Sequence, residues 1–168
     1  IGMLRDSQNR VRSMSLIHQT LYQSQNFAQV DFQRFLGELL PRLTESYGAR
    51  SRRVNIDIRA LDVKLPINDA IPCGLIVNEL VSNALKHGFP DDRCGTVLVE
   101  IRQDADQVVE LSISDDGQGI PPERDLARSE SLGLQLVNLL TRQLHGQLDI
   151  QRCNPTRFTL RFRMGDKP

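Results

Sequence analysis

Two periodicities of apolar and polar side chains divide the chain into predicted elements. Apolar residues that recur at three-, four- and seven-residue steps are typical of amphipathic helices. This spacing predicts helices within residues 1–26 and over 31–47, 68–87 and 131–144. Period-two alternation predicts strands over 54–58, 95–103 and 108–114, with two closing strands at 147–152 and 156–163. Residues 61–65 are interpreted as a short hairpin partner of 54–58, and residues 115–130 as a loop.

Individual residues sharpen the helix boundaries. Asp31 is expected to cap the second helix, because a short acidic side chain can accept a bond from a free backbone N–H. Pro41 lacks a backbone donor, so it predicts a kink or an early break in that helix. Asn68 or Asp69 is expected to cap the third helix, whose first turn tolerates Pro72.

Composition narrows the class of protein. The chain has 168 residues with 21 Lys+Arg and 21 Asp+Glu, which is the size of one domain and gives no net charge. A neutral, aromatic-poor chain is not expected to bind nucleic acid, and no apolar run is long enough to span a membrane. Cys73, Cys94 and Cys153 form no C-x-x-C pair, so we expect neither a zinc site nor a disulfide framework. The expected location is a reducing compartment, the cytoplasm.

The first predicted helix has two interpretations. Its apolar positions are Leu4, Val11, Met14, Ile17 and Leu21. Such a helix either packs on its own domain or forms half of a helical hairpin whose partner lies outside the chain. Because the chain starts within the pattern, a fragment of a longer protein is expected.

The helix that ends near residue 87 carries the most chemistry. At 100° per residue, its apolar side chains share one arc, and Glu79, Asn83, Lys86 and His87 lie on the other side. This polar strip is either a solvated face or a site for a metal–phosphate ligand, since carboxylate and amide oxygens suit Mg²⁺ and a lysine suits a phosphate.

Two further motifs lie downstream. Asp115–Ile120 (DDGQGI) follows an apolar strand, and its glycines let a backbone approach a ligand, although an ordinary Asp-Gly turn has the same pattern. Ser131–Leu134 (SLGL) opens a helix whose free N–H groups suit a phosphate, or it is a plain N-cap.

In order and spacing, these motifs resemble the ATP-binding domain of histidine kinases, whose superfamily includes type II topoisomerases, mismatch-repair ATPases and heat-shock chaperones. Asn78–His87 resembles the N box, Asp115–Ile120 the first glycine box and Ser131–Leu134 the second. Together with Arg12–Ser24, the segment Ile71–His87 is similar to the bacterial subfamily related to HWE kinases.

The resemblance implies an α+β fold, a two-layer α/β sandwich in which helices cover one face of a mixed sheet. It also implies a role for each polar residue of the N box. Asn83 would ligate Mg²⁺ between the ATP phosphates, with Glu79 supporting the metal through water. Lys86 and His87 would reach phosphate or ribose, and Asp115 would hold the adenine amine.

The glycine boxes would complete the nucleotide site. Gly117 and Gly119 would form the floor of the pocket, and residues 121–130 would be the ATP lid. The other residues that the resemblance assigns to nucleotide binding are Ile120, Ser131, Leu132, Gly133 and Leu134. The chain departs from the pattern at several points. Ser131 replaces the first glycine of the second box, the lid is short and has no Phe, and Asn154-Pro155 stands where a glycine often precedes the last strand. The absence of Trp excludes the W-x-E motif of strict HWE kinases.

The implied function is the catalytic portion of a two-component sensor histidine kinase. Residues 1–26 would be the second helix of a dimerisation hairpin and residues 27–168 the catalytic domain. The acceptor histidine would lie outside the chain, with His18 a seam or surface residue. The partners would be a response regulator receiver domain and a second copy of the full-length protein. The alternatives are a phosphotransfer or scaffold protein that has lost ATP binding, an anti-sigma-type serine kinase, and a hydrolase that uses Glu79 as its base.

Overall fold

The computed structural model describes residues 11, 14, 15, 17, 19, 29–48, 53–60, 62–91, 93–123, 132–153 and 155–165. A five-stranded sheet with the order β2-β4-β5-β7-β6 forms its main layer. The strands of this sheet are β2 (Val54–Arg59), β4 (Gly95–Gln103), β5 (Val108–Asp115), β6 (Gln147–Gln151) and β7 (Thr156–Arg163). The β2–β4 pair is parallel and the other three pairs are antiparallel, so the sheet is mixed, as predicted.

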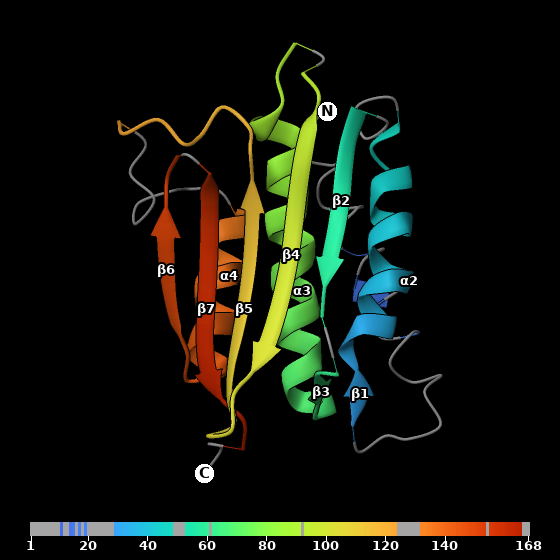
Figure 1. Cartoon of the computed structure of the whole chain (residues 1–168), viewed down its shortest axis with the longest axis vertical. Helices are drawn as coiled ribbons and strands as arrows, with labels where there is room; N and C mark the ends of the chain where they lie inside the picture. The colour runs from blue at the N-terminus through green and yellow to red at the C-terminus, as the bar shows by residue number, and fades with distance from the viewer. Residues whose placement is uncertain are drawn as a thin grey trace.

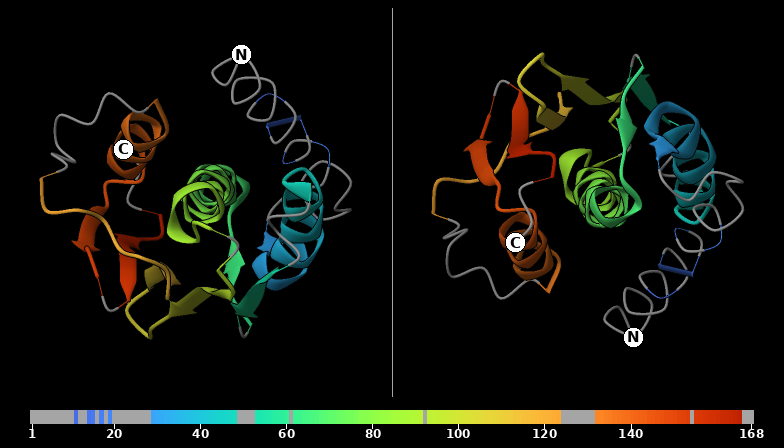
Figure 2. Two further views of the ribbon diagram at one scale, coloured as in Figure 1. Left: turned by 90° about the horizontal axis from the view of Figure 1, so that it is seen from above. Right: turned by 90° about the horizontal axis from the view of Figure 1, so that it is seen from below.

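Within the described ranges, three helices cover one face of this sheet. They are α2 (Phe32–Glu45), α3 (Ile67–Asn83) and α4 (Leu132–Gln143). The sheet curves around α3, which lies between α2 and α4 when the molecule is viewed from above or below (Figure 2). Figure 1 shows the same two layers with the strands in front. The predicted two-layer sandwich is therefore confirmed.

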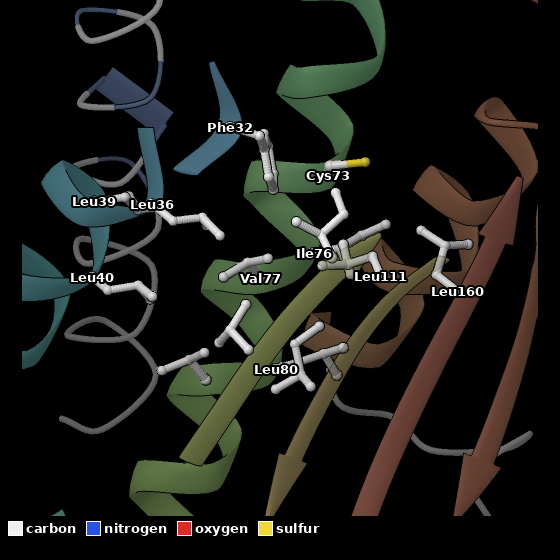
Figure 3. Packing of buried hydrophobic residues seen from close by; sticks show 14 of the residues in the cluster. Phe32, Leu36, Leu39, Leu40, Cys73, Ile76, Val77, Leu80, Leu111 and Leu160 are labelled. Carbon is white, nitrogen blue, oxygen red and sulfur yellow. The ribbon is translucent and has the colours of Figure 1, made fainter. Parts of the chain in front are cut away.

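Apolar side chains of α3 fill the space between the two layers. Ile76 and Val77 are fully buried, and the sheet contributes Leu111 and Leu160 from β5 and β7 (Figure 3). Four leucines of α2 complete the core, as its helical spacing predicts: Leu36, Leu39, Leu40 and Leu43. The helix α3 packs against α2, α4 and the sheet. Most of its residues are therefore buried, including polar ones.

The expected hairpin between residues 54–58 and 61–65 is wrong. Instead, a two-residue strand β3 (Lys64–Leu65) pairs with β1 (Val30–Asp31), in a second, separate sheet. Backbone bonding from Phe32 N to Val63 O (3.0 Å) extends this contact. The strand β2 takes β4 as its partner, because the chain crosses over through α3 before it returns to the sheet.

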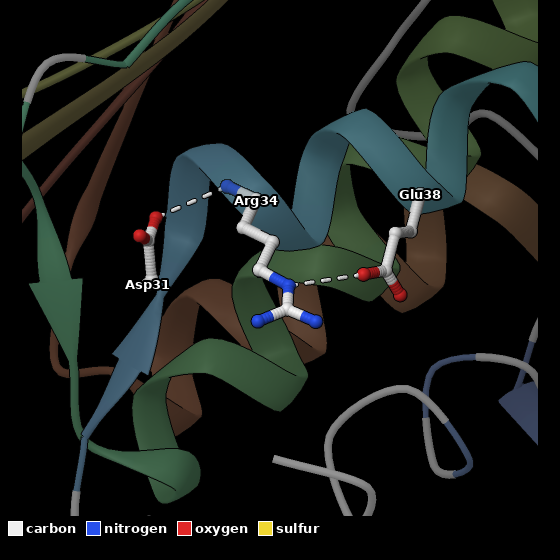
Figure 4. A network of polar contacts seen from close by, with 3 residues as sticks. All are labelled: Asp31, Arg34 and Glu38. Carbon is white, nitrogen blue, oxygen red and sulfur yellow. Dashed lines mark hydrogen bonds and ion pairs between the residues drawn. The ribbon is translucent and has the colours of Figure 1, made fainter.

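The start of α2 follows the prediction, whereas its interior does not. The Asp31 side chain accepts a hydrogen bond from Arg34 N (3.0 Å), and Arg34 pairs with Glu38 one turn later (Figure 4). The helix continues through Pro41 to Glu45, so the predicted early break does not occur. Pro41 is exposed, and its carbonyl accepts a bond from the Thr44 hydroxyl (2.7 Å).

The start of α3 also differs from the prediction. The N-cap is Pro66, whose carbonyl accepts bonds from Asp69 N and Ala70 N, and no side chain caps the helix. Asn68 and Asp69 therefore lie inside the first turn. At its other end α3 continues into a π-helical turn, η2 (Ala84–Gly88), which carries the last residues of the N box.

The N-terminal segment is described at five helical positions. Ile17 is buried, whereas Val11 and Met14 are 66% and 42% exposed. His18 and the apolar positions Leu4 and Leu21 lie outside the described residues. Among the residues that are described, no helix is both long and apolar enough to cross a membrane.

Candidate functional site

A cavity of about 200 Å³ opens between α3, the loop after β5, β7 and α4. We call the segment 80–88 on one side of it the helix wall, and the segment 113–121 with Thr156 and Phe158 on the other side the strand wall. Six residues expected from the sequence to bind nucleotide line the cavity: Asn83, His87, Asp115, Gly119, Ile120 and Leu134. Three elements far apart in sequence are thus brought to one site.

Asp115 is the central polar group of the strand wall. It ends β5, is 9% exposed and accepts a hydrogen bond from Gly117 N (3.0 Å). Burial raises the pKa of the Asp115 carboxyl, and the neighbouring Asp116 raises it further; the Gly117 N–H, the Thr156 hydroxyl and Arg93 act in the opposite direction. A buried carboxylate with an open side towards a cavity is a strong acceptor for a ligand N–H.

The loop after Asp115 is held at close quarters to the end of the helix wall. Gln118 N donates to Gly88 O (2.8 Å), and the Gln118 side chain donates to His87 O (2.7 Å). A Cβ on Gly117 would lie 2.4 Å from Gly88 O and 2.6 Å from Asp115 Oδ1, so only glycine fits there. Gly119 has a φ of +83°, a conformation that residues with a Cβ rarely adopt, so this position also requires glycine.

The far side of the loop is fixed by residues after β6. Ile120 N donates to Arg152 O (2.8 Å). The Arg152 guanidinium in turn donates to the carbonyls of Pro121 (3.2 Å) and Pro122 (3.3 Å). The first two residues of the predicted lid, Pro121 and Pro122, are thereby bonded to Arg152. Residues 124–130 lie outside the described residues.

The predicted polar strip of α3 is split between three environments. Glu79 is buried (4% exposed), which excludes a simple solvated face, and Asn83 one turn later lines the cavity. His87 is exposed and lines it as well. Lys86 does not line the cavity; its Nζ lies 5.9 Å from the centre of the Tyr47 ring. The π-helical turn adds a residue to the repeat, so a uniform 100° step fails after Asn83.

The second glycine box is partly described. Gly133 is buried in the first turn of α4, Leu134 lines the cavity, and Leu132 is 59% exposed on the outside. Ser131 lies outside the described residues.

Sequence reasoning missed eight residues that line the cavity. They are Leu80, Ala84, Gly88, Ile113, Gln118, Pro121, Thr156 and Phe158. Thr156 stands out because the register of β5 against β7 places it opposite Asp115, and its hydroxyl bonds to that carboxyl. Alternating apolar positions on β5 and β7 predict that Ile113 and Phe158 are buried, but the pairing of strands is needed to place them together.

The oxygen donors of Asn83 and Glu79 fit a magnesium ion. Asn83 offers an amide oxygen at the cavity surface and Glu79 a carboxylate one helical turn away, and Mg²⁺ is usually held by one or two such side chains plus water and phosphate oxygens. Within the described ranges, no group of three or more His, Cys, Asp or Glu side chains is placed to hold a metal ion.

Known proteins were compared with this chain. A family model described as "Histidine kinase-, DNA gyrase B-, and HSP90-like ATPase" matches residues 68–166, and a model described as "Histidine kinase" matches residues 1–47. Sensor histidine kinase PdtaS of Mycobacterium tuberculosis is 32% identical over 152 residues, which cover 88% of this chain and 29% of that protein. Blue-light-activated histidine kinase 2 of Erythrobacter litoralis is 30% identical over 118 residues, covering 70% and 34%.

A solved structure shares the fold. The histidine kinase domain of the blue-light-activated kinase EL346 of Erythrobacter litoralis superposes with a TM-score of 0.81 at 24% identity, covering 94% of this chain and 78% of that one. The chain spans about a third of the length of the curated relatives it matches. The family model covers the helix wall, the strand wall and α4, and the predicted relationship is confirmed. The chain belongs to the histidine kinase-, DNA gyrase B- and HSP90-like ATPase family.

Proposed function

We propose that this chain is the ATP-binding catalytic portion of a sensor histidine kinase, which transfers the γ-phosphoryl group of Mg-ATP to a histidine outside the chain. The observation that carries the proposal is the buried Asp115 carboxylate facing a cavity whose other wall presents Asn83 and His87. The matches of residues 1–47 and 68–166 to histidine kinase and ATPase models support it.

Each wall of the cavity has a separate task in this proposal. Asp115 accepts a hydrogen bond from the exocyclic amine of adenine, while the apolar side chains Ile113 and Phe158 receive the base. Asn83, with Glu79 behind it, would hold Mg²⁺, and His87 lies at the phosphate end. Lys86 would reach the phosphates by leaving its contact with the Tyr47 ring. Bound Mg²⁺ supplies positive charge that offsets the phosphate oxygens.

The transfer itself needs positioning more than a strong base. A neutral imidazole nitrogen of the acceptor attacks the γ-phosphorus, the N–P bond forms, the bond to the bridging oxygen breaks, and ADP leaves. The imidazole proton passes to solvent. The phosphohistidine would then pass its phosphoryl group to a response regulator, and the hairpin segment, residues 1–26, would join two copies of the longer protein.

Nucleotide binding gives the first test. Mg-ATP at a hundredfold excess over its Kd stabilises a protein of this size by about 2.7 kcal/mol, which raises the Tm by roughly 5–10 °C. Asn83→Ala should remove most of the magnesium-dependent part of this shift. Asn138→Ala, an exposed amide on α4, is the matched control and should leave the shift intact. No shift in the wild-type chain would contradict the proposal and favour a scaffold that has lost ATP binding.

The chemistry of the product gives the second test. A longer chain that includes the acceptor helix should form an acid-labile phosphate when supplied with Mg-ATP, because phosphohistidine hydrolyses in acid. Acid-stable phosphate on a protein substrate would instead favour a serine kinase. Rapid ATP turnover without any acceptor, abolished by Glu79→Ala, would favour a hydrolase with Glu79 as general base.

A further inference from the structure

One side chain expected at the phosphates is held elsewhere. Lys86 occupies the middle of the π-helical turn η2, and its ammonium lies 5.9 Å from the centre of the Tyr47 ring. Tyr47 follows the end of α2 and is anchored by a backbone bond from its N–H to Thr44 O (3.0 Å). Both side chains are partly buried, so the contact lies at the edge of the α2–α3 interface.

The contact has the geometry of a cation–π pair. An ammonium within about 6 Å of a ring centroid is attracted by the negative face of the ring, and the attraction is small where water can reach the pair. Lys86 makes this contact while its neighbours along the helix wall, Asn83 and His87, line the cavity. Lys86, the lysine of the helix wall, therefore contacts the Tyr47 ring after α2 instead of lining the cavity.

We propose that Tyr47 is a positioning residue that holds Lys86 back from the nucleotide phosphates. The inference rests on the proposed function and deepens it, because it identifies what the phosphates must displace. A bound triphosphate attracts the ammonium more strongly than the ring does, so the lysine moves to the phosphates and the Tyr47 contact is lost. ATP affinity is therefore lowered by the strength of the Tyr47–Lys86 contact.

The arrangement also connects α2 with the cavity. Tyr47 is the last residue matched by the model described as "Histidine kinase", and α2 leads directly into it. A shift of α2 that changes the distance between ring and ammonium changes how readily Lys86 reaches a triphosphate.

A double-mutant cycle tests the inference. Tyr47→Leu keeps an apolar side chain but removes the ring, so Mg-ATP affinity of the full chain should rise about two- to fivefold, the equivalent of an exposed cation–π contact. Adenosine affinity should stay constant, because adenosine has no phosphate for Lys86 to bind. Tyr47→Phe keeps the ring and should restore the wild-type Kd. In a Lys86→Met background, Tyr47→Leu should have no effect on ATP affinity.

Three results would overturn the proposal that Tyr47 holds Lys86 back. A fall in ATP affinity on Tyr47→Leu, an equal change for adenosine, or an unchanged effect in the Lys86→Met background would each give Tyr47 a merely structural role. If Tyr47→Leu does not fold, the Lys86 side-chain methylene resonances of the wild-type chain decide: Mg-ATP should remove their ring-current shift. A wild-type chain that binds no Mg-ATP would instead contradict the proposed function.

Discussion

The two walls of the cavity are built differently. On the strand wall, Asp115 accepts a bond from Gly117 N, Gln118 is bonded to the end of the opposite wall, and Ile120 is fixed by Arg152. On the helix wall, His87 is exposed and Lys86 lies against Tyr47, outside the cavity. The strand wall is thus formed before a ligand arrives, whereas part of the helix wall must move. The proposed kinase activity would gain from this division, because base recognition is constant while phosphate contacts change during transfer.

The most damaging change to the strand wall is expected at Gly117. In Gly117→Ala the new methyl group meets Gly88 O and Asp115 Oδ1, so the loop must shift. Mg-ATP affinity, measured by calorimetry, should fall by at least about a hundredfold, and the free energy of unfolding should drop by about 1–3 kcal/mol. Gly37→Ala is the control, since nothing lies within 4 Å of a Cβ there. Equal affinity in both variants would show that the strand wall is not rigid.

Removing the charge of Asp115 tests base recognition without changing the shape of the wall. Asp115→Asn can still accept the bond from Gly117 N, yet it loses a charged acceptor, and ATP affinity should fall about ten- to a hundredfold. The preference for ATP over GTP should shrink with it, as competition binding can measure. Asp106→Asn, in the exposed turn between β4 and β5, should change neither quantity.

The pH dependence of ATP binding should report the same carboxyl. Its pKa is raised by burial, so protonation begins at a higher pH than for an ordinary aspartate. As pH falls through that raised pKa, ATP affinity should fall by up to about tenfold per pH unit. The folded state favours the protonated form, so the contribution of Asp115 to stability changes in the opposite sense: it is present at low pH and lost as pH rises through the raised pKa. Asp115→Asn should flatten this component of both profiles.

The smallest effect is expected at the edge of the strand wall. Arg152→Gln removes the guanidinium that bonds the carbonyls of Pro121 and Pro122. Because the backbone bond from Ile120 N to Arg152 O remains, ATP affinity should fall only about two- to fivefold, with a faster dissociation rate. Arg142→Gln, exposed on α4, is the control. A loss as large as that of Asp115→Asn would place a main binding contact in the lid.

Sequence reasoning succeeded where a signal is local. Alternation along β4 and β5 gave the strands, and an Asp-Gly loop after an apolar strand gave Asp115 at the cavity. It failed where the outcome depends on distant partners. The partner of β2 could not be read from its own residues, and Thr156 reaches Asp115 only through the register of β5 and β7.

The helix wall shows a second kind of limit. Predicting Lys86 beside Asn83 and His87 assumes one helical repeat throughout, and the π-helical turn breaks that repeat within the motif itself. No residue in the sequence marks where such a turn begins. The buried state of Glu79 was equally hidden, because the polar strip of a helix predicts exposure unless neighbouring helices cover it.

The parallel pair β2–β4 has a consequence for how the domain folds. Val54 pairs with Gly95 although the whole of α3 lies between them in the sequence. The pairs β4–β5 and β6–β7, by contrast, join strands that are neighbours along the chain. Loop-closure entropy makes such non-local pairing slow. The edge formed by α2 and β2 should therefore assemble last and open first during native-state fluctuations. Tyr47 lies between α2 and β2 along the chain, so the earliest opening of this domain would release Lys86 while the strand wall stays intact.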